Sequence, residues 1–476
     1  MIRLYSLTAG LLLLVCGLSA QDFISKELKG SRSRALLTSQ FGNFIQNGIV
    51  MYKVTYTTPD VFGQLDTASG LLLVPLREEA TRYPLLVYQH GTVDGPQDVP
   101  SNLRGGYELA TVFAGMGYVT LAPDYLGAGE SRGFHPYVHA ASEASAALDM
   151  LRATRSHAPE MDLLLNEQLF VTGYSQGGHA SMALHKAIEE NFGEEFTVTA
   201  ASHMSGPYSI SGVMRELILS DEAYFTPAYL PNTYLSYNYV YGFYDSTVQI
   251  FKPQYVDGID AFFNGELGLF ALNAQLIAQL TAETGASVTR NMLQDSIVTI
   301  LSNPDDDHPL LNALRDNDVY EWAPQQPTRI FYCTADDQVP YRNSIVADSV
   351  MNALGAPAVV AVDVNSSADH GGCVEPAVIN TILFFANFAQ WVVNTEVAHL
   401  PLAVQLGPNP VQDRLYIRGL TVATHYRLFT TDGRLVQEGQ LNIGSPELDL
   451  STLTAGLYII HLQNSEGKLI RQLVVN

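Results

Sequence analysis

The hydrophobic positions of the chain fall into short apolar runs separated by longer segments with mixed polarity. Two early runs, Ile49–Thr57 and Ser69–Val74, are rich in β-branched and aromatic residues and are joined by a turn-rich segment. Six further runs of strand length follow: Leu85–Tyr88, Tyr118–Leu121, Leu169–Thr172, Val198–Ala201, Ile330–Cys333 and Val359–Val362. We expect these runs to be strands of one buried sheet.

Helix-like segments lie between most of these runs: Gly106–Met116, Ala140–Thr154, Gly177–Asn191, Arg342–Leu354 and Pro376–Val393. Strands that alternate with helices predict an α/β class fold, with a doubly wound, mostly parallel sheet covered on both faces. The last segment is interrupted by Asn380, Asn387 and Gln390, which favours a buried helix over a membrane span. Ligands of such sheets bind at the carboxyl ends of the strands.

Residues 210–325 separate two successive core strands by a stretch far longer than an ordinary crossover, which predicts an inserted helical cap. Two interpretations of its aromatic side chains stay open, namely packing of the cap against the core and lining of an apolar substrate pocket. The aromatic residues concerned are Tyr224, Phe225, Tyr229, Tyr234, Tyr237, Tyr239, Tyr241, Phe243 and Tyr244.

The pattern changes near the C-terminus, where a proline-bearing linker at residues 398–410 precedes short alternating strands. Asp432-Gly433 and Glu466-Gly467 are typical of hairpin turns. Residues 411–476 are therefore expected to form a small β-sandwich, and residues 21–397 the larger domain. The expected strands are Arg414–Ile417, Tyr426–Thr430, Glu447–Leu450, Leu457–Leu462 and Leu469–Val475.

Charge and the N-terminus narrow the class of protein. The 25 Lys and Arg against 48 Asp and Glu give a net charge of −23, which opposes binding to nucleic acid or anionic lipid through a basic patch. Residues 1–20 combine Arg3, an apolar stretch and a small residue, Ala20, which predicts an export signal cleaved near Ala20. A short membrane anchor and a lipid-modified Cys16 are the alternatives, and no transmembrane span is expected in the mature chain.

One motif carries chemistry. Gly173-Tyr-Ser175-Gln-Gly177 lies between an apolar run and a helical segment, as in the sharp strand-to-helix turn that exposes a nucleophilic serine. Downstream, Asp336 follows a strand, and His370 lies in a small-residue loop after the next strand. Acyl transfer needs a serine, an imidazole and an orienting carboxylate, and these three residue types occur here in the order Ser, Asp, His.

Each candidate has competitors. Asp337 is the alternative acid, whereas Asp369 is too close to His370 in the chain to orient its ring easily. His179 and His185 compete less well as bases because neither follows the last core strand, and neither does His90, to which we assign a structural role. The oxyanion donors are expected to be backbone N–H groups of Gln176, after the serine, and of Thr92, in a glycine-bearing loop after an earlier strand.

The motifs from Ser69–Pro75 through Gln89–Thr92, Ala122–Gly129 and Gly173–Gly178 resemble the α/β-hydrolase superfamily, in particular secreted lipases and esterases with a helical cap. The resemblance covers roughly residues 49–393, although the cap carries no motif that places it. It implies Ser175, Asp336 and His370 as the catalytic triad and no cofactor. Asp124 and Gly127 would then be structural loop residues.

The C-terminal segment independently resembles the sorting domain of type IX secretion cargo. The resemblance rests on Pro408-Asn-Pro410, Asp432-Gly-Arg434, Ala455-Gly-Leu-Tyr458 and the terminal Gly467–Asn476. It implies contact with the type IX secretion machinery, translocation across the outer membrane, and a secreted or surface location. A carbohydrate-binding or interaction sandwich is the alternative.

The cysteines and the acidic clusters indicate which covalent links and metal sites the sequence allows. The mature chain keeps Cys333 and Cys373, which lie in loops expected to be neighbours, and we expect a disulfide between them, with two buried thiols as the alternative. No metal motif is present, and Asp305-Asp306-Asp307 lacks the spacing of a calcium loop. The sequence thus predicts a secreted serine hydrolase of carboxylic esters on small-molecule or lipid substrates. A serine peptidase and a non-catalytic surface binding protein are the alternatives.

Overall fold

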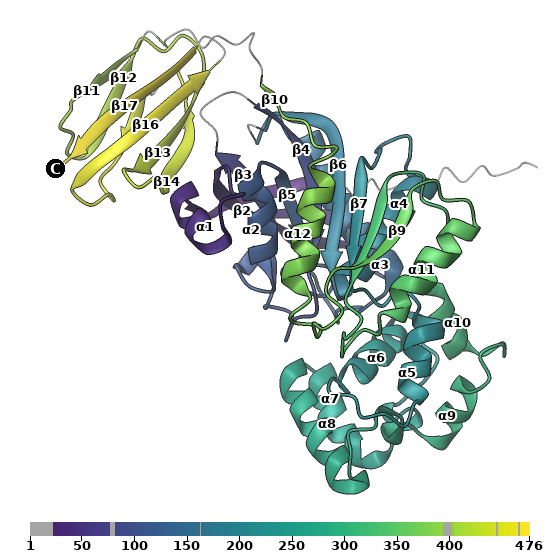
Figure 1. Cartoon of the computed structure of the whole chain (residues 1–476). Coiled ribbons are helices and arrows are strands. Elements are labelled where there is room, and N and C mark those ends of the chain that lie inside the picture. Colours follow the sequence, from purple (N-terminus) through teal and green to yellow (C-terminus); the bar gives the residue numbers. More distant parts are fainter. Residues whose placement is uncertain are drawn as a thin grey trace, which may run out of the picture.

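The computed structural model describes residues 22–76, 81–161, 163–393, 402, 404–443, 446–464 and 467–476. The predicted signal peptide lies outside these residues, as do positions 398–401 and 403 of the predicted linker. The described chain forms a large α/β unit, a helical cap and a C-terminal β-sandwich (Figure 1).

The large unit is built on a twisted sheet whose strands follow the predicted apolar runs. Their order across the sheet is β1-β2-β3-β5-β4-β6-β7-β8-β9, and β10 pairs with one end of β4. The strands span β1 Phe23–Arg32, β2 Gly48–Pro59, β3 Leu65–Leu76, β4 Thr81–Gln89, β5 Val119–Pro123, β6 Leu165–Tyr174, β7 Ala200–Met204, β8 Thr328–Tyr332, β9 Val359–Asp363 and β10 Val392–Val393.

Strand direction divides this sheet into two parts. The pairs from β5 to β9 are parallel, whereas β1, β2 and β3 are joined to one another and to β5 by antiparallel pairs. The parallel register aligns Gln89 of β4 with Gly173 of β6, and Gly173 with His203 of β7. The carboxyl ends of β4, β6, β7 and β8 therefore meet at one edge, as the alternation of strands and helices predicts.

Helices cover both faces of the sheet, so the predicted doubly wound, mostly parallel α/β fold is confirmed (Figure 1). The helices α1 Arg34–Phe41, α2 Tyr107–Met116 and α12 Val374–Phe385 pack on one face. The helices α3 Ala140–Ser156, α4 Gln176–Asn191 and α11 Arg342–Ala353 pack on the other. In the described ranges, all helices fall short of the length and apolar character needed to cross a bilayer.

Two of the differences from expectation concern the main sheet and its covering helices. The helix expected to continue to Val393 ends at Phe385, where the side-chain amide of Asn387 donates to the carbonyls of Leu383 and Phe384 and closes the last turn. Strand β1 was not predicted, because it is an edge strand with exposed charged residues and therefore lacks an apolar run.

The cap lies between β7 and β8, over the carboxyl end of the sheet (Figure 1). Its elements are a π-helical turn at Ile210–Met214 and the helices α5 Arg215–Leu219, α6 Tyr229–Tyr241, α7 Pro253–Phe263, α8 Leu269–Thr284, α9 Asp295–Leu301 and α10 Pro309–Asp316. Helix α8 illustrates its folding: Leu269, Leu272, Leu276 and Leu280 recur at helical spacing and are all buried. The cap thus has its own core, against which Tyr137 and Val138 of the main unit also pack.

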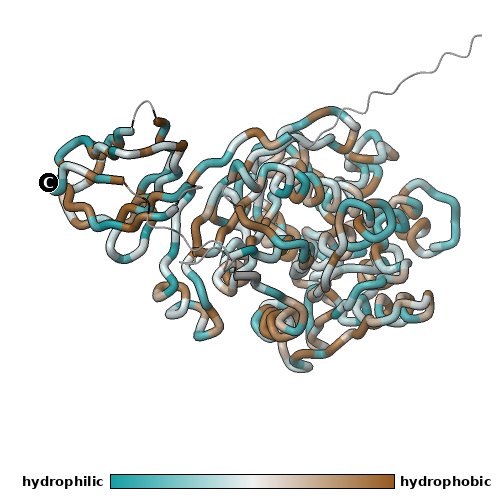
Figure 2. Tube along the Cα trace, turned by 90° about the horizontal axis from the view of Figure 1, so that it is seen from above, coloured by the Kyte–Doolittle hydropathy of each residue, from teal (hydrophilic) through white to brown (hydrophobic). Residues whose placement is uncertain are grey.

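The C-terminal part is a sandwich of two antiparallel sheets, β11-β12-β15 and β14-β13-β16-β17, around a shared apolar core. The strands span β11 Gln405–Gly407, β12 Arg414–Arg418, β13 Thr424–Thr430, β14 Leu435–Leu441, β15 Glu447–Asp449, β16 Gly456–Asn464 and β17 Gly467–Val475. The sandwich lies beside the large unit in both overall views (Figures 1 and 2).

The sandwich contacts the antiparallel edge of the main sheet. Phe429 and Leu435 are buried in the same apolar cluster as residues of β2 and β3. The Leu435 backbone N–H donates to Ser31 Oγ at 2.8 Å, and the Tyr52 hydroxyl donates to Glu438 at 2.8 Å. These contacts lie away from the carboxyl ends of the parallel strands, so the sandwich leaves that edge to the cap.

Candidate active site

Ser175 occupies the sharp turn between β6 and α4. Its backbone has φ +61° and ψ −123°, a conformation that a residue with a side chain adopts only under constraint. The constraint comes from the backbone: Ser175 N donates to the Met204 carbonyl at 3.0 Å, and the Ser175 carbonyl accepts from Gly178 N at 2.8 Å and from His179 N at 3.3 Å. The turn projects the serine side chain from the carboxyl edge of the sheet.

The glycines of the motif are required by close backbone approach. A Cβ at Gly173 would lie 2.1 Å from the Gly177 carbonyl oxygen, and one at Gly177 would lie 2.0 Å from the Gln89 carbonyl oxygen. Both distances are far inside van der Waals contact with backbone atoms that cannot move aside. The pattern Gly-x-Ser-x-Gly is therefore dictated by packing of the turn against β4.

Ser175, His370 and Asp336 form a hydrogen-bonded chain. Ser175 Oγ lies 2.9 Å from His370 Nε2, and His370 Nδ1 lies 2.8 Å from Asp336 Oδ2. Because a carboxylate only accepts, Nδ1 carries the hydrogen and Nε2 is left to accept from the serine hydroxyl. The structure thus brings together the three residues that the sequence predicted, from loops after β6, β8 and β9.

The remaining carboxylates of this edge bind backbone rather than the imidazole. Asp337 Oδ1 accepts from the His370 backbone N–H at 3.1 Å, and Asp369 Oδ1 accepts from Gly372 N at 2.7 Å. Asp336 is itself held by Gln338 N and Val339 N, which both donate to its second oxygen. Asp337 therefore positions the histidine loop, whereas Asp336 faces the ring.

The two predicted oxyanion donors flank the serine. Gln176 is the first residue of α4, where a backbone N–H has no partner within the helix. Thr92 follows Gly91, whose Cβ position would lie 3.3 Å from the Tyr174 carbonyl oxygen and 3.7 Å from Ser175 Cβ. The loop after β4 thus approaches the nucleophile turn closely, and the Thr92 hydroxyl is 2.8 Å from the Tyr137 hydroxyl.

The other histidines near the motif have structural surroundings. His90 is fully buried, its ring centroid lies 4.2 Å from that of Tyr125, and its Nδ1 is 2.8 Å from the Gly91 carbonyl oxygen. Burial lowers the pKa of His90 to about 4, so the ring stays neutral at physiological pH. His179 and His185 lie within α4 and are paired with glutamates.

Asp124 and Gly127 hold the loop after β5. The Asp124 carboxylate accepts from Ser69 Oγ at 2.6 Å and from Ser101 N at 2.9 Å, and burial raises its pKa despite these bonds. Gly127 has φ +72°, and a Cβ there would lie 2.4 Å from the backbone of Phe134. Both residues have the surroundings of structural loop residues.

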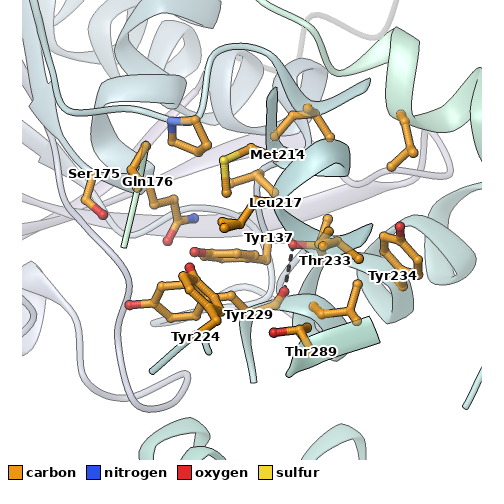
Figure 3. A pocket seen from close by; sticks show the side chains of 17 residues that line it. Tyr137, Ser175, Gln176, Met214, Leu217, Tyr224, Tyr229, Thr233, Tyr234 and Thr289 are labelled. Carbon is orange, nitrogen blue, oxygen red and sulfur yellow. Dashed lines mark hydrogen bonds between the residues drawn. The ribbon is translucent and has the colours of Figure 1, made fainter. Parts of the chain in front are cut away.

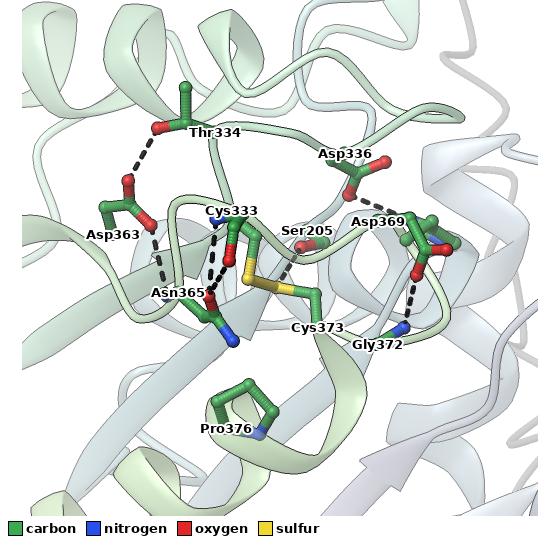
Figure 4. The surroundings of a disulfide bond; sticks show 12 residues. Ser205, Cys333, Thr334, Asp336, Asp363, Asn365, Asp369, Gly372, Cys373 and Pro376 are labelled. Atoms are coloured by element: carbon green, nitrogen blue, oxygen red, sulfur yellow. Dashed lines mark hydrogen bonds and ion pairs between the residues drawn. A yellow bond between two sulfur atoms is a disulfide. The ribbon is translucent and has the colours of Figure 1, made fainter.

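Cys333 and Cys373 form a disulfide with a Cα–Cα distance of 5.9 Å (Figure 4). Cys333 directly follows β8, the strand that leads to Asp336, and Cys373 lies three residues after His370, at the start of α12. Both sulfur-bearing side chains are fully buried. The bond therefore ties the acid-bearing loop to the histidine-bearing loop directly beneath the hydrogen-bonded chain.

A pocket with about 640 Å³ of empty space, counting its open mouth, extends from Ser175 under the cap (Figure 3). Ser175 and Gln176 lie at one end, and Tyr234 lies toward the other. Its walls are mainly apolar and aromatic side chains, including Tyr137, Ile210, Met214, Leu217, Ile218, Tyr224, Tyr229, Leu230, Leu314 and Val339.

The cap aromatics thus divide between the two interpretations left open by the sequence. Tyr224, Tyr229 and Tyr234 line the pocket. Tyr237 is fully buried in the cap core, whereas the Phe225 side chain is 64% exposed. Lining and packing both occur, and the residue type alone did not separate them.

Sequence reasoning missed the polar side chains that surround Gln176. Its side-chain amide contacts Glu143 of α3 and His135 of the preceding loop, each at 2.8 Å. Glu143 is fully buried within an otherwise ordinary helix, and an acidic residue at a buried helical position was the signal available.

Comparison with solved structures relates the large unit and cap to known hydrolases. The rice cell wall degrading esterase LipA from Xanthomonas oryzae is 26% identical, with a TM-score of 0.68, over 78% of this chain and 98% of its own. Legionella pneumophila lpg1103 is 22% identical with a TM-score of 0.69, over 77% of this chain and 98% of its own. Candida antarctica lipase A is 14% identical with a TM-score of 0.55, over 74% and 78% of the two chains.

No curated protein matches the chain at the level of sequence. The C-terminal residues 405–476 match the secretion system C-terminal sorting domain, which confirms the predicted export to the cell surface or medium through type IX secretion. The solved neighbours support a hydrolase. The chain therefore has the α/β-hydrolase fold with a helical cap, followed by a type IX secretion sorting domain.

Proposed function

We propose that the protein is a secreted serine hydrolase of carboxylic esters, with Ser175, His370 and Asp336 as its catalytic triad. The observation that carries the proposal is the hydrogen-bonded chain of these residues at the end of an apolar pocket. An esterase and a lipase among the solved neighbours support ester bonds as the target.

Acylation begins when the ester carbonyl lies beside Ser175. His370 Nε2 takes the hydroxyl proton as Ser175 Oγ attacks the carbonyl carbon, and Asp336 stabilises the resulting imidazolium through Nδ1. The carbonyl oxygen becomes an oxyanion, toward which the backbone N–H groups of Gln176 and Thr92 donate. His370 then gives the proton to the departing alcohol, which leaves an acyl-enzyme.

Deacylation repeats these steps with water. His370 removes a proton from the water as it attacks the acyl carbon, the same backbone groups stabilise the second oxyanion, and the proton returns to Ser175 as the acid leaves. No cofactor takes part in this sequence. The pocket under the cap accommodates the acyl group, because its walls are apolar and aromatic and it begins at Ser175.

The domain organisation follows from the same proposal. Residues 1–20 act as a signal peptide, residues 21–397 carry the hydrolase with its cap at about 210–325, residues 398–410 link the parts, and residues 411–476 form the sorting sandwich. The sorting domain engages the type IX secretion machinery, and the hydrolase meets small-molecule or lipid esters outside the cell.

Two measurements on the purified full chain test the proposal. A fluorophosphonate probe is expected to label wild type and not Ser175→Ala. Esters of p-nitrophenol with short to long acyl chains, assayed beside a panel of peptide anilides, are expected to be hydrolysed in preference to the anilides. Absence of labelling would indicate a non-catalytic binding protein, and preferential anilide cleavage would indicate a peptidase.

A further inference from the structure

A buried polar network lies directly behind Ser175 and uses none of the residues assigned to the triad. It joins Glu143 of α3, Gln176 and His179 of α4, His135 of the loop before α3, and Asn317 after α10. Glu143 and His179 are fully buried, and Gln176 is 1% exposed. A buried carboxylate destabilises the fold unless all its hydrogen-bond partners are in place. The presence of Glu143 here therefore suggests that the network has a role beyond stability.

Hydrogen-bond partners determine how the network is protonated. His179 Nδ1 lies 2.7 Å from Glu143 Oε2, and His179 Nε2 lies 2.9 Å from the Asn317 carbonyl oxygen. A carbonyl only accepts, so Nε2 carries a hydrogen, and one proton is shared along the Nδ1–Oε2 contact. Whichever atom holds that proton, the Glu143–His179 pair has no net charge, which makes its burial tolerable.

The same comparison of donors and acceptors shows how the Gln176 side chain is oriented. His135 Nδ1 lies 2.9 Å from the Leu126 carbonyl oxygen and therefore carries a hydrogen, which leaves His135 Nε2 as an acceptor. Gln176 Nε2 lies 2.8 Å from His135 Nε2 and 2.8 Å from Glu143 Oε1. Both N–H bonds of the amide are used, so the side chain is held at two points from two different elements.

We propose that Glu143, supported by His179, is a positioning residue that holds Gln176 so that its backbone N–H stays aimed at the oxyanion. This inference rests on the proposed function. Gln176 adjoins Ser175, whose strained backbone persists only where the surroundings fix it. The His179 backbone N–H also donates to the Ser175 carbonyl, so the network holds the turn through side chain and backbone together.

The network also ties the turn to the cap. Asn317 directly follows α10, accepts from His179 through its carbonyl, and accepts from Ala140 N through its side chain at 2.8 Å. Glu143 and Ala140 belong to the first turn of the same helix, α3. Displacement of the cap end would therefore be transmitted to Gln176 through one helix turn.

The test compares Glu143→Leu with Glu143→Gln in the full chain. Leucine removes both acceptors, whereas glutamine keeps an oxygen for Gln176 and offers an N–H to a neutral His179 Nδ1. We expect Glu143→Leu to lower kcat for a p-nitrophenyl ester by about 10- to 100-fold with KM nearly unchanged, because a small displacement of an oxyanion donor has an effect of that order. Glu143→Gln is expected to restore most of the loss.

A trifluoromethyl ketone inhibitor separates positioning from general destabilisation. It forms a tetrahedral adduct with the serine, and its oxygen occupies the oxyanion site. Its Ki should rise in Glu143→Leu by the same factor by which kcat/KM falls. The matched control is Glu189→Leu, which breaks a second histidine–glutamate pair on α4, His185–Glu189 at 2.8 Å, with His185 fully buried and Glu189 half-buried, away from the pocket. It should lower thermal stability and leave kcat and Ki unchanged.

A second variant covers the case in which Glu143→Leu does not fold. His135→Phe keeps a ring beside Tyr125, with which His135 stacks at 5.6 Å, but offers Gln176 no acceptor, and it should shift kcat and Ki in the same direction. Wild-type kcat and Ki in the folded variant, or equal impairment in Glu143→Leu and Glu143→Gln, would overturn the inference. Inactivity of wild type toward every ester would instead overturn the proposed function.

Discussion

In the part of the chain that the structure describes, two hydrogen-bonded chains join a serine, one or two histidines and an acid; one begins at the residue before α4 and the other within α4. The proposed triad joins Ser175, His370 and Asp336. The second chain, here called the buried relay, runs from Ser181 Oγ to His203 Nδ1 at 2.7 Å, from His203 Nε2 to His185 Nδ1 at 3.3 Å, and from His185 Nε2 to Glu189 at 2.8 Å. Their distances are similar, but their surroundings are not.

The two chains differ in the position of the hydrogen between the serine oxygen and the imidazole nitrogen. The Ser181 hydroxyl donates to the Gly178 carbonyl at 2.9 Å, so the hydrogen between Ser181 and His203 must come from the imidazole. His203 therefore presents an N–H to its serine and is unable to take a proton from it. His370 presents a bare nitrogen to Ser175, because its other nitrogen donates to a carboxylate.

The two serines also differ in how accessible their hydroxyl groups are to a substrate. Ser181 is a mid-helix residue with no exposed surface, whereas Ser175 lies on a strained turn, is 8% exposed and borders the pocket. Ser175 also adjoins Gln176, one of the two proposed oxyanion donors, which begins α4. Residue types and hydrogen-bond lengths are therefore insufficient to identify a nucleophile, and the comparison teaches that acceptor direction and access decide it.

Exchange of the two serines for alanine gives the largest expected contrast. Ser175→Ala should reduce kcat by about 10⁴-fold or more, because a triad loses most of its effect with its nucleophile. Ser181→Ala should leave kcat within about twofold and lower the free energy of unfolding by about 1 kcal/mol, the value of one buried hydrogen bond. Ester hydrolysis rates and urea unfolding curves check both, and a large loss of kcat in Ser181→Ala would contradict the assignment.

Substitutions of the acidic residues of the two chains are expected to give the next largest difference in kcat. Asp336→Asn should reduce kcat by up to about 10⁴-fold while the fold is retained, since an amide no longer holds His370 in the tautomer that accepts from serine. Glu189→Gln in the buried relay should leave kcat unchanged. Asp337→Asn is the neighbouring control, because Asp337 holds only the His370 backbone. Equal losses in Asp336→Asn and Asp337→Asn would remove the distinction between the two acids.

The disulfide is a further difference between the two chains, because among the described residues it joins the loops that carry Asp336 and His370. Replacing Cys333 and Cys373 together by serine should lower the free energy of unfolding by roughly 4 kcal/mol on the chain-entropy model, given their sequence separation of 40. Thermal unfolding of the double variant measures this loss. Thiol titration of denatured wild type should find no reactive pair without reductant and two thiols with it; two thiols in both cases would exclude the bond.

Acid stability gives the smallest expected effect and concerns the buried relay. Burial, followed by repulsion from His185, lowers the pKa of His203 well below its usual value of 6.5. The unfolded chain therefore binds this proton first as the pH falls, so the contribution of His203 to stability is complete above about pH 6.5 and is lost below it. Urea midpoints between pH 7 and pH 5 should fall less steeply in His203→Gln than in wild type. Parallel curves would show that His203 is not held neutral.

Much of the fold was predictable because its signals are local. The strands β2 to β9 were visible as apolar runs. The central strands β4, β5 and β7 are buried at nearly every position, because helices cover both faces of the sheet there. Strand β1 was missed because it lies at an edge, and β14, which was also missed, carries polar residues at most of its central positions. The cap insertion was predictable from chain length alone, but its helix packing was not.

The candidate site was predictable in its residues but not in its surroundings. Gly173, Ser175 and Gly177 indicated the turn because close backbone approach restricts these positions to glycine or forces strain on the serine. The choice of Asp336 over Asp337 as the partner of the His370 ring needed coordinates, because both acids lie in the same loop and contact different parts of His370. Glu143 carried no local signal beyond its type.

Local sequence signals were sufficient to predict the strand–turn–helix around Ser175, the order of the three candidate residues, the long insertion and the C-terminal sorting sandwich. These features depend on turn chemistry, hydrophobic spacing and segment length, which act between near neighbours in the chain. The acid that faces His370, the cap tyrosines that line the pocket, and the hydrogen bond between Glu143 and Gln176 became visible only in the folded chain. Those outcomes depend on side chains brought together from distant segments, where a difference of a few ångströms in packing selects one hydrogen-bond partner over another.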